Sequence, residues 1–550
     1  VVKKLLIVAA LIAAVPGFGN NNAVPALQSG SRDGDRPIHA AGIMGQGEIV
    51  GVLDTGLDWD SCYVAEPDGS PPPVNTVAAD GSLQRSNVDP ARRKVIAYDF
   101  LFSCEEYPGA EGCDTAAFPH AWDNQGHGTH AAGAIAGDRS QHLVWDYGDA
   151  IAPGAKLVIQ DAGFIGGDAC SQRPGLRCPV RDLGEVLSQA YDQGVRIHSN
   201  SWGDRQGAGP DQIPPTANYN DWTAQIDQFV FDHPDILVVF NSGNAGRLGD
   251  YSVSSPGSAK NTLQVGGFRW YEDEPAVLHW SGSGPTRDGR LKPEVIAPAF
   301  VLAADSDLDV TTNNCHANVE GGTSWSAPIV AGAAALVRQY YRDGFLTDGI
   351  ASHDGFSPSS ALLKATLVAA ARPAARFDDG EGPVPEPVEP RPSFDQGFGM
   401  PVLDDVLVLD GDPESLWVRD IDTLAVSQGE TVGYRFDVRQ SGRFRVVLAW
   451  VDPPGAGSDQ SPAVSRLVND LDLKVIGPGG EIHLGNEELT AAPDRLNNLE
   501  VITIDVPDPG RYTVVVEGHA IRFGSAQSAA IVVSGELDEV IDRRRGVRRR

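Results

Sequence analysis

The sequence predicts an α/β fold, a three-layer parallel sheet with helices on both faces, followed by a smaller antiparallel β-sandwich. Segments typical of strands and helices alternate from about residue 48 to residue 368, which favours a parallel sheet covered on both faces. Short alternating strands separated by Gly, Pro and Asp turns follow from residue 416 to residue 537, as in a sandwich. Because 550 residues exceed one ordinary core, we expect two domains.

The first domain is expected over residues 38–412. Residues 49–53 form an apolar run with the length and β-branched content of a buried parallel strand. The other elements that the pattern predicts are strands at residues 156–160 and 236–241 and helices at residues 131–136, 183–193, 226–232 and 327–337. Residues 372–393 are rich in proline, which forces extended, solvated backbone and predicts a surface loop.

The second domain is expected over residues 415–537, after a boundary near residues 410–415. The predicted strands lie at residues 431–438, 443–451, 471–476, 501–506 and 511–517. Residues 538–550 form a basic tail, which we expect to be disordered and dispensable. Binding to an anionic surface is the alternative role for this tail.

Residues 1–22 are predicted to be a secretory signal peptide. Lys3 and Lys4 precede an apolar core at residues 5–15, which is too short to span a membrane. No other segment approaches 18 continuous apolar residues. We therefore expect a secreted protein of the bacterial-export type, without stable membrane insertion.

Six cysteines in an exported chain predict disulfides, with 15 possible pairings. Local spacing favours Cys104 with Cys113 and Cys170 with Cys178. Cys62 and Cys315 then remain as a long-range pair. Free buried thiols are the alternative.

Composition excludes some classes of partner. The net charge of −31 argues against nucleic acid, because the phosphate backbone attracts basic surfaces. The hydrophobic content of 41% is typical of a globular protein rather than a disordered one. We expect a monomer.

Three short segments carry the residues of a nucleophilic hydrolase. Asp54 ends the strand at residues 49–53, His127 lies in Gly-His-Gly-Thr-His, and Ser324 lies in Gly-Gly-Thr-Ser-Trp-Ser-Ala-Pro. A serine hydroxyl is a poor nucleophile at neutral pH, so it needs a histidine to take its proton. A carboxylate must orient that histidine and stabilise its charged form. The context places His127 and Ser324 at helix N-termini beside strand ends, where α/β sheets usually carry their sites.

At these residues the chain resembles the subtilisin-like serine proteases, or subtilases (peptidase S8), whose triad has this Asp, His, Ser order. The resemblance covers roughly residues 38 to 410, and residues 394–399 resemble the family's return to the catalytic domain, which makes residues 372–393 an insertion. It implies that Asp54 orients His127, that His127 is the general base and acid, and that Ser324 attacks the peptide carbonyl. Asn244 falls on the family's oxyanion-hole asparagine, and the backbone N–H of Ser324 would be the second donor.

The same resemblance implies a set of substrate contacts. Ser201, Trp202 and Gly203 match the segment that pairs with an extended peptide backbone, and Gly243 would form a further wall of the pocket. Strand addition of this kind recognises main chain first, so proteins and peptides are the expected substrates. The chemistry itself requires no cofactor.

Each of these residues alone has a simpler interpretation. Asp54 fits many strand-end turns, and Ser324 could only cap a helix. His127 and His130 could suggest a metal pair, but the zincin motif needs a Glu after the first histidine and Gly128 follows instead. The joint occurrence of the motifs in order outweighs these interpretations.

Trp325 departs from the family, in which most members carry Met after the nucleophile. Replacing the thioether removes one route of oxidative inactivation, although the larger indole could crowd the substrate pocket. We predict that activity survives with an altered rate or side-chain preference.

Calcium is the predicted structural ion of the second domain. Residues 467–473 resemble the C-terminal jelly-roll domain of certain bacterial subtilases and the P domain of proprotein convertases. Asn469, Asp470 and Asp472 offer closely spaced oxygen ligands, with Asn486 and Asn497 as possible additions. The alternative is that these residues only make turns.

The sequence as a whole predicts a secreted serine endopeptidase. Two alternatives stay open: a processing protease with one narrow target, and a catalytically inactive subtilase-fold module that binds through its sandwich.

Overall fold

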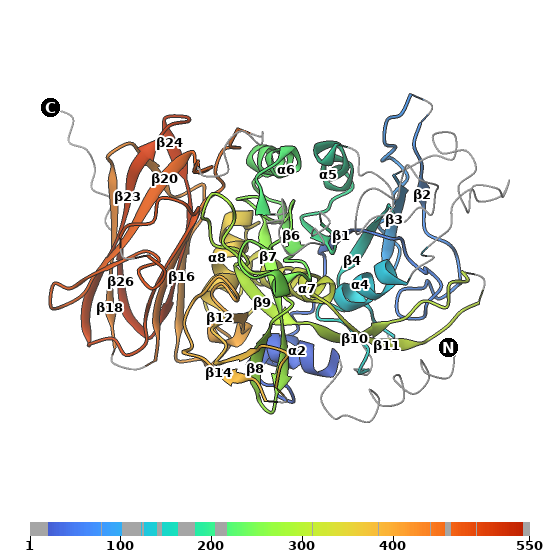
Figure 1. Ribbon diagram of the computed structural model, residues 1–550, viewed down its shortest axis with the longest axis horizontal. Helices are drawn as coiled ribbons and strands as arrows, with labels where there is room; N and C mark the ends of the chain where they lie inside the picture. The colour runs from blue at the N-terminus through green and yellow to red at the C-terminus, as the bar shows by residue number, and fades with distance from the viewer. Residues whose placement is uncertain are drawn as a thin grey trace.

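The computed structural model shows an α/β unit packed against a β-sandwich (Figure 1). It describes residues 20–78, 80–101, 123, 126–139, 146–162, 182–203, 217–310, 312–382, 384–439, 442–456, 464–490 and 492–542. Within these residues, no helix is both long and apolar enough to cross a bilayer. The predicted bond between Cys62 and Cys315 is present, whereas the other four cysteines lie outside the described residues.

The main sheet has eleven strands in the order β14-β13-β8-β7-β6-β5-β1-β4-β3-β2, with β9 beside β7. Its strands are β1 (Ile49–Asp54), β2 (Val74–Asn75), β3 (Val95–Phe100), β4 (Lys156–Asp161), β5 (Ile197–Asn200), β6 (Leu237–Asn241), β7 (Leu263–Tyr271), β8 (Glu274–Leu278), β9 (Val295–Pro298), β13 (Arg376–Asp378) and β14 (Glu386–Pro387). The central pairs from β3 to β7 are all parallel, as the apolar runs predict.

Helices cover both faces of this sheet. They are α2 (Asn20–Ser29), α3 (Pro37–Ala40), α4 (His127–Ala136), α5 (Leu183–Asp192), α6 (Asp221–Asp232), α7 (Thr323–Arg342) and α8 (Ser360–Ala369), with short 3₁₀ turns η2 (Gly246–Leu248) and η3 (Leu403–Asp405). Leu53, His198 and Phe240 lie together with residues of α5 and α6. α7 contacts β5, β6 and β7 and packs beside α4 (Figure 1). Every helix predicted from the sequence is present.

The α/β unit extends further toward the N-terminus than residue 38. Ala23, Val24 and Leu27 of α2 are fully buried, and α2 contacts β9, α7 and β10 (Phe300–Ala304), which forms a hairpin with β11 (Ala317–Gly321). These residues therefore belong to the same core. Residues 1–19 lie outside the described residues, so the signal peptide stays a prediction.

The proline-rich segment is not a simple surface loop. β13 pairs in parallel with β8, and β14 pairs with β13 as the outermost strand of the main sheet. Prolines are tolerated there because an edge strand needs only one row of backbone hydrogen bonds. β12 (Ala371–Arg372) and β15 (Met400–Pro401) then pair at the base of this insertion.

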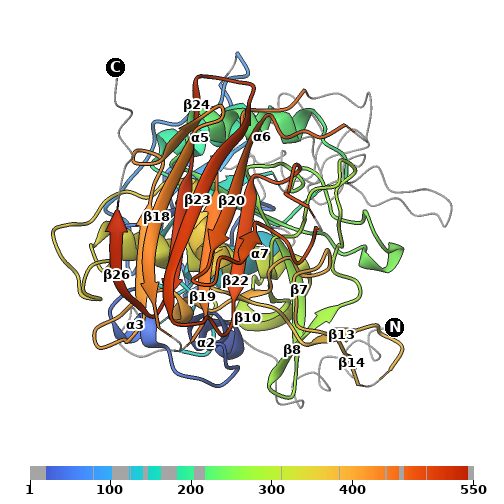
Figure 2. The same cartoon turned by 90° about the vertical axis from the view of Figure 1, so that its left-hand side faces the viewer.

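The second unit is a sandwich of two antiparallel sheets (Figure 2). One sheet has the order β16-β25-β19-β22 and the other β21-β20-β23-β18-β26, while β17 and β24 form a separate pair. The strands are β16 (Ser415–Arg419), β17 (Ala425–Ser427), β18 (Thr431–Val438), β19 (Phe444–Ala449), β20 (Asn469–Ile476), β21 (Ile482–Leu484), β22 (Leu499–Ile504), β23 (Gly510–Ile521), β24 (Ala526–Ser528), β25 (Ala530–Gly535) and β26 (Leu537–Asp542). All five predicted strands are present. The prediction of a disordered tail is wrong for residues 538–542, because β26 reaches Asp542 and pairs with β18.

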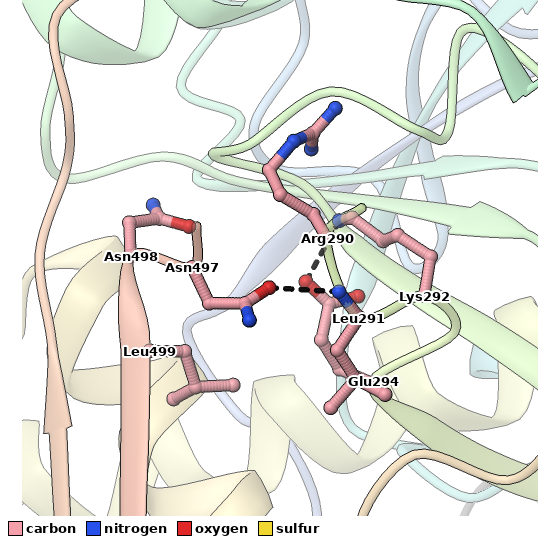
Figure 3. A pocket seen from close by; sticks show the side chains of 7 residues that line it. All are labelled: Arg290, Leu291, Lys292, Glu294, Asn497, Asn498 and Leu499. Atoms are coloured by element: carbon pink, nitrogen blue, oxygen red, sulfur yellow. Dashed lines mark hydrogen bonds and ion pairs between the residues drawn. The ribbon is translucent and has the colours of Figure 1, made fainter. Parts of the chain in front are cut away.

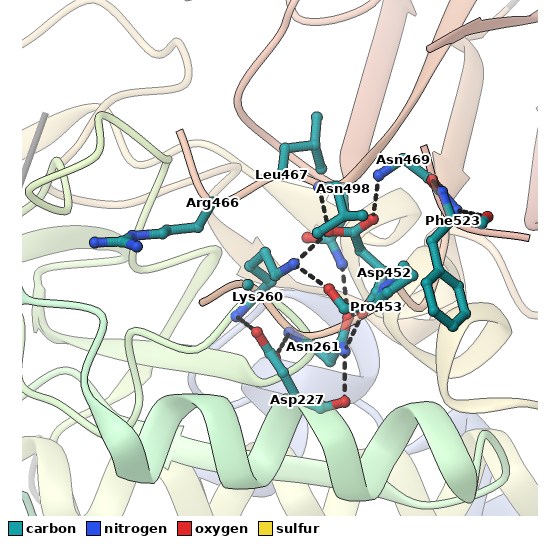
Figure 4. A network of polar contacts seen from close by, with 12 residues as sticks. Asp227, Lys260, Asn261, Asp452, Pro453, Arg466, Leu467, Asn469, Asn498 and Phe523 are labelled. Carbon is teal, nitrogen blue, oxygen red and sulfur yellow. Dashed lines mark hydrogen bonds and ion pairs between the residues drawn. The ribbon is translucent and has the colours of Figure 1, made fainter. Parts of the chain in front are cut away.

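The two units share a buried polar interface (Figure 4). Lys260 of the α/β unit forms an ion pair with Asp452 of the sandwich, and both side chains are fully buried. Asn261 donates to the Asp452 carbonyl (2.9 Å) and accepts from its backbone N–H (3.0 Å). Asp227 accepts from the Asn261 backbone N–H (2.8 Å), and Asn498 donates to the Asn261 side chain (3.1 Å). Buried charges persist only when paired and hydrogen-bonded, so the two units form one continuous body.

A second set of contacts lies beside this network (Figure 3). The Asn497 side chain accepts a hydrogen bond from the backbone N–H of Leu291 (2.8 Å), and Lys292 pairs with Glu294 (2.7 Å). α8 also packs on β19 and β25, where Arg445 donates to the Ala369 carbonyl (3.1 Å). The sandwich thus packs against the α/β unit through its four-stranded sheet.

Candidate active site

The three residues predicted to carry the chemistry lie at strand ends and helix N-termini. Asp54 is the last residue of β1, His127 is the first residue of α4, and Ser324 is the second residue of α7. The parallel strands of an α/β sheet end at one edge, which is where such sheets place their sites.

A short hydrogen bond joins Asp54 to His127. Oδ1 of Asp54 lies 2.6 Å from Nδ1 of His127, and the same oxygen accepts from the backbone N–H of Thr55 (2.7 Å). Burial opposes the charged imidazole, but the Asp54 carboxylate, together with Asp123 and Glu320, outweighs burial, so the pKa of His127 lies above its ordinary value. The carboxylate therefore orients the ring and stabilises its protonated form.

Ser324 is held by reciprocal contacts with Ser201. The Ser201 hydroxyl donates to the Ser324 carbonyl (2.6 Å), and Ser324 Oγ donates to the Ser201 carbonyl (3.4 Å). In the described part of the chain, Oγ makes no hydrogen bond to His127. The ring of Trp325, the next residue, packs on the His127 ring at 4.6 Å between centroids, so the two helix ends are close. Rotation of a serine about one bond redirects its hydroxyl, and catalytic hydrogen bonds commonly tighten only around substrate.

Asn244 is oriented by the residue before the nucleophile. Its Oδ1 accepts from the backbone N–H (3.0 Å) and from the hydroxyl (2.9 Å) of Thr323. Only the amide oxygen can accept the N–H, so Nδ2 remains available as a donor. The backbone N–H of Ser324 has no acceptor within α7, because it belongs to the first helical turn. Two donors thus lie beside the nucleophile.

The predicted substrate segment can offer a substrate its backbone, because the Trp202 side chain belongs to the core. The Trp202 side chain is 3% exposed, donates to Asn200 (3.2 Å) and packs on Phe240, so only its backbone remains for a substrate. Gly243 has φ +90°, which favours glycine, and its carbonyl accepts from Gly282 (2.9 Å). Gly203 is packed closely, because a Cβ there would lie 2.8 Å from Ser254.

Comparison with known protein families assigns the α/β unit. Residues 45–399 match the model of the subtilase family, Peptidase_S8. The chain belongs to the subtilase family. This subtilase is similar to the serine protease/ABC transporter B family protein tagA of Dictyostelium discoideum, 27% identical over 618 residues. The match covers 92% of the chain, hence both units, and 31% of tagA.

Other known proteins match smaller parts of the subtilase chain. Pyrolysin of Pyrococcus furiosus is 24% identical over 370 residues, which cover 56% of this chain and 23% of pyrolysin. The chain thus spans about a third or less of the length of these two relatives. A solved structure, the S41 psychrophilic protease, is 18% identical with a TM-score of 0.41 and covers 65% of this chain and 92% of that chain.

Asp123 is a site residue of this subtilase that the sequence analysis missed. Within the described residues, its buried carboxylate accepts from Thr55 Oγ1 (2.8 Å), Gly126 N–H (2.9 Å), and the N–H and hydroxyl of Thr129 (both 2.7 Å). Thr55 Oγ1 accepts in turn from the backbone N–H of Gly128 (2.9 Å). This carboxylate clamps the start of α4 to the residue after Asp54. An Asp shortly before a helix is a known capping signal, which could have indicated this role.

The loop after Asp54 carries a second pair of buried acids. Asp58 and Asp60 are 1% and 7% exposed. The backbone N–H of Cys62, which forms the disulfide with Cys315, donates to the Asn314 carbonyl (2.8 Å). Burial, together with the neighbouring Asp58, raises the pKa of Asp60 to about 7. We therefore expect the charge of this loop to change near neutral pH.

The predicted calcium ligands do not meet at one point. Asn469 Oδ1 accepts from the backbone N–H groups of Arg522 (2.8 Å) and Phe523 (2.9 Å). Asp470 and Asp472 lie on the other face of β20, because strand residues alternate, and both pair with Arg495. This set therefore does not fit one calcium ion.

The suggested additional ligands are also engaged elsewhere. Asn486 and Asn497 both donate to Asp494, at 2.6 Å and 2.7 Å. Across the described ranges, no three His, Cys, Asp or Glu side chains converge as metal ligands. The guanidinium of Arg495 provides the positive charge beside Asp470 and Asp472.

Proposed function

We propose that this subtilase is an exported serine endopeptidase with Asp54, His127 and Ser324 as its catalytic triad. The observation that carries the proposal is the 2.6 Å hydrogen bond between Asp54 and His127, at a helix end that packs beside Ser324. Family membership supports the same chemistry.

The chemistry follows from the positions of these groups. Ser324 Oγ attacks the peptide carbonyl carbon while its proton passes to Nε2 of His127, and the carbonyl π electrons move onto oxygen. The N–H of Ser324 and Nδ2 of Asn244 donate to that oxyanion. The protonated His127, stabilised by Asp54, then gives its proton to the leaving amine as the C–N bond breaks. Water attacks the acyl-enzyme by the same steps and releases Ser324.

Extended polypeptide is the proposed substrate class. The backbone at residues 201–203 lies next to Ser324, and its side chains are turned to the core, which suits recognition of main chain rather than of one side chain. This arrangement supports a broad endopeptidase over a processing enzyme with one narrow target.

Export is proposed on two grounds. Residues 3–15 have the composition of a signal peptide, and a disulfide joins Cys62 to Cys315. Disulfides persist in oxidising compartments and are rare in the cytosol.

Digestion of an unfolded protein mixture tests the proposal. We expect cleavage at many sites, read out by mass spectrometry of the new termini, and no cleavage by the Ser324→Ala protein. Cleavage of one sequence only would favour a processing protease. A purified, folded protein that cleaves nothing would favour the inactive binding module.

A further inference from the structure

Trp325, the residue after Ser324, is held between two histidine rings. Its side chain is 3% exposed, and its ring centroid lies 4.6 Å from that of His127 and 4.3 Å from that of His130. His130 is itself fixed, because its Nε2 lies 3.1 Å from the Val301 carbonyl oxygen. The packing therefore leaves the indole little freedom to turn.

The indole N–H of Trp325 has no hydrogen-bond partner among the described residues, although it is fully shielded from solvent. Buried tryptophans usually pair this group, because a buried donor without an acceptor loses its hydrogen bond to water. Trp202 near the site and Trp450 in the sandwich follow that rule, since Trp202 donates to Asn200 (3.2 Å) and Trp450 to the Asn469 carbonyl (2.9 Å), whereas Nε1 of Trp270 has no partner among the described residues. Trp325 is thus a donor in need of an acceptor.

Three donor nitrogens surround one point beside Gly322. A Cβ atom built on Gly322 would lie 3.6 Å from Trp325 Nε1, 3.7 Å from the Ser324 backbone nitrogen and 3.8 Å from Asn244 Nδ2. An indole nitrogen, a backbone nitrogen and an amide nitrogen can only donate. Because Gly322 has no side chain, no methyl group separates these three donor nitrogens from one another.

We propose that the indole N–H of Trp325 is a third donor of the oxyanion hole. The inference rests on the proposed function and extends it. When Ser324 Oγ bonds to the carbonyl carbon, the electron pair that moves onto the carbonyl oxygen is stabilised by Ser324 N–H, Asn244 Nδ2 and Trp325 Nε1–H together. The stack on His127 and His130 holds the indole in place before the reaction, which limits the reorganisation needed when charge develops.

A structural role would predict different behaviour. If the indole only filled space, any side chain of similar shape would serve, and the missing N–H would change stability alone. If it only set the environment of His127, its removal would move the pH dependence of kcat/KM. A donor to the oxyanion instead affects kcat and the binding of tetrahedral analogues.

The test compares Trp325→Phe, which keeps an aromatic ring but lacks the N–H, with the wild type. Removing one oxyanion donor lowers kcat by about 10²- to 10³-fold in the strongest cases, and with two donors remaining we expect about 10- to 100-fold. KM and the apparent pKa of the acid limb should stay unchanged. Affinity for a peptide aldehyde, which forms a tetrahedral adduct with Ser324, should fall by a factor similar to kcat/KM.

Trp450→Phe is the matched control. It also removes a buried indole N–H, but in the sandwich, so it should lower the melting temperature and leave kcat unchanged. Trp325→Met, which also lacks the donor, should repeat the loss seen with Trp325→Phe and guards against a folding defect of that variant.

The inference is overturned if Trp325→Phe folds and keeps kcat/KM and aldehyde affinity within twofold of the wild type. A crystal structure of the wild type with a peptide boronate decides the case if neither variant folds. Nε1 within about 3.2 Å of a boronate oxygen supports the donor, and a separation above about 3.5 Å rejects it. A wild type that cleaves no peptide would instead refute the proposed function.

Discussion

Replacing Asp123 by Asn should separate the positioning of His127 from its chemistry. Among the residues that the structure describes, each oxygen of this carboxylate accepts from one backbone N–H and one hydroxyl. Asn keeps the shape but offers a single acceptor oxygen. At the position of the other oxygen, the new NH2 group faces one hydroxyl and one backbone N–H. The hydroxyl, of Thr55 or Thr129, can rotate to accept from the NH2 group, whereas the backbone N–H can only donate.

One buried backbone N–H is therefore left without a partner in the Asp123→Asn variant. That costs about 1–3 kcal/mol, and loss of a negative charge at the start of α4 costs about 0.3–1 kcal/mol more. We expect a destabilisation of about 1–4 kcal/mol. A displacement of about 1 Å at a catalytic group can lower the rate on the order of 10²-fold, so kcat should fall about 10- to 100-fold.

Steady-state kinetics and denaturant unfolding on the same samples provide the assay. KM should change little, because the described groups that bind the Asp123 carboxylate lie in the loop after Asp54 and at the start of α4, outside the predicted substrate segments. Asp182→Asn is the matched control, since Asp182 caps α5 by accepting from Gly184 N–H (2.8 Å) and Glu185 N–H (3.3 Å), away from the site. The reasoning fails if Asp123→Asn keeps kcat within twofold of the wild type, or if Asp182→Asn lowers kcat as much.

Three further predictions concern the interface and the titrating groups. Lys260→Met should lower the free energy of unfolding by about 3–5 kcal/mol, because it leaves the buried Asp452 carboxylate without its cation. Adding Asp452→Asn, which removes the charge and keeps one oxygen to accept from the backbone N–H of Val468 or Asn469, should restore part of the loss; equal losses in denaturant unfolding would contradict this. The general base must be neutral, and the pKa of His127 is raised, so kcat/KM should rise with pH through an apparent pKa above 6.5; an acid limb centred below 6.5 would oppose this assignment. Asp60 has its pKa raised from 3.8 to about 7, so the folded state loses stability as pH rises through that range. Asp60→Asn should therefore raise the melting temperature at pH 8, with a gain that shrinks toward pH 4, and a gain independent of pH would count against it.

The periodicity of the sequence predicted the helices and strands whose own residues carry a strong apolar pattern. β1 and β6 are apolar runs buried on both faces, and β18 occupies the residues predicted for it, 431–438, because alternation of apolar and polar residues is strong there. The same patterns placed Asp54 at a strand end and His127 and Ser324 at helix N-termini. These features follow from local propensity and burial.

Elements that depend on a distant partner were not predictable in this way. β13 forms because the edge of β8 is available more than 90 residues earlier in the chain, and α2 is buried through β9, β10 and α7 rather than through its own pattern. Asn469, Asp470 and Asp472 were predicted to bind one calcium ion because they are close in the sequence. In a strand, however, neighbouring side chains point to opposite faces.

In the candidate active site, too, local pattern predicted some contacts, whereas others depend on distant parts of the chain. Asp54 contacts His127 and Asn244 contacts Thr323, which is compatible with the roles that motif order predicts. Motif order could not predict that Ser324 Oγ donates to Ser201 or that Asp123 fastens α4. Those contacts depend on rotamers and on packing between segments that are far apart in the chain.

The rate of fluorophosphonate labelling at Ser324 tests the central claim most directly. The probe reacts with an activated serine, so mass spectrometry of wild-type protein should place the label on Ser324 alone. In His127→Ala the labelling rate should fall by several orders of magnitude, since loss of a triad member costs on the order of 10⁶-fold in turnover in the best-studied case, subtilisin. An unlabelled wild type, or a label that forms equally fast without His127, would contradict the account.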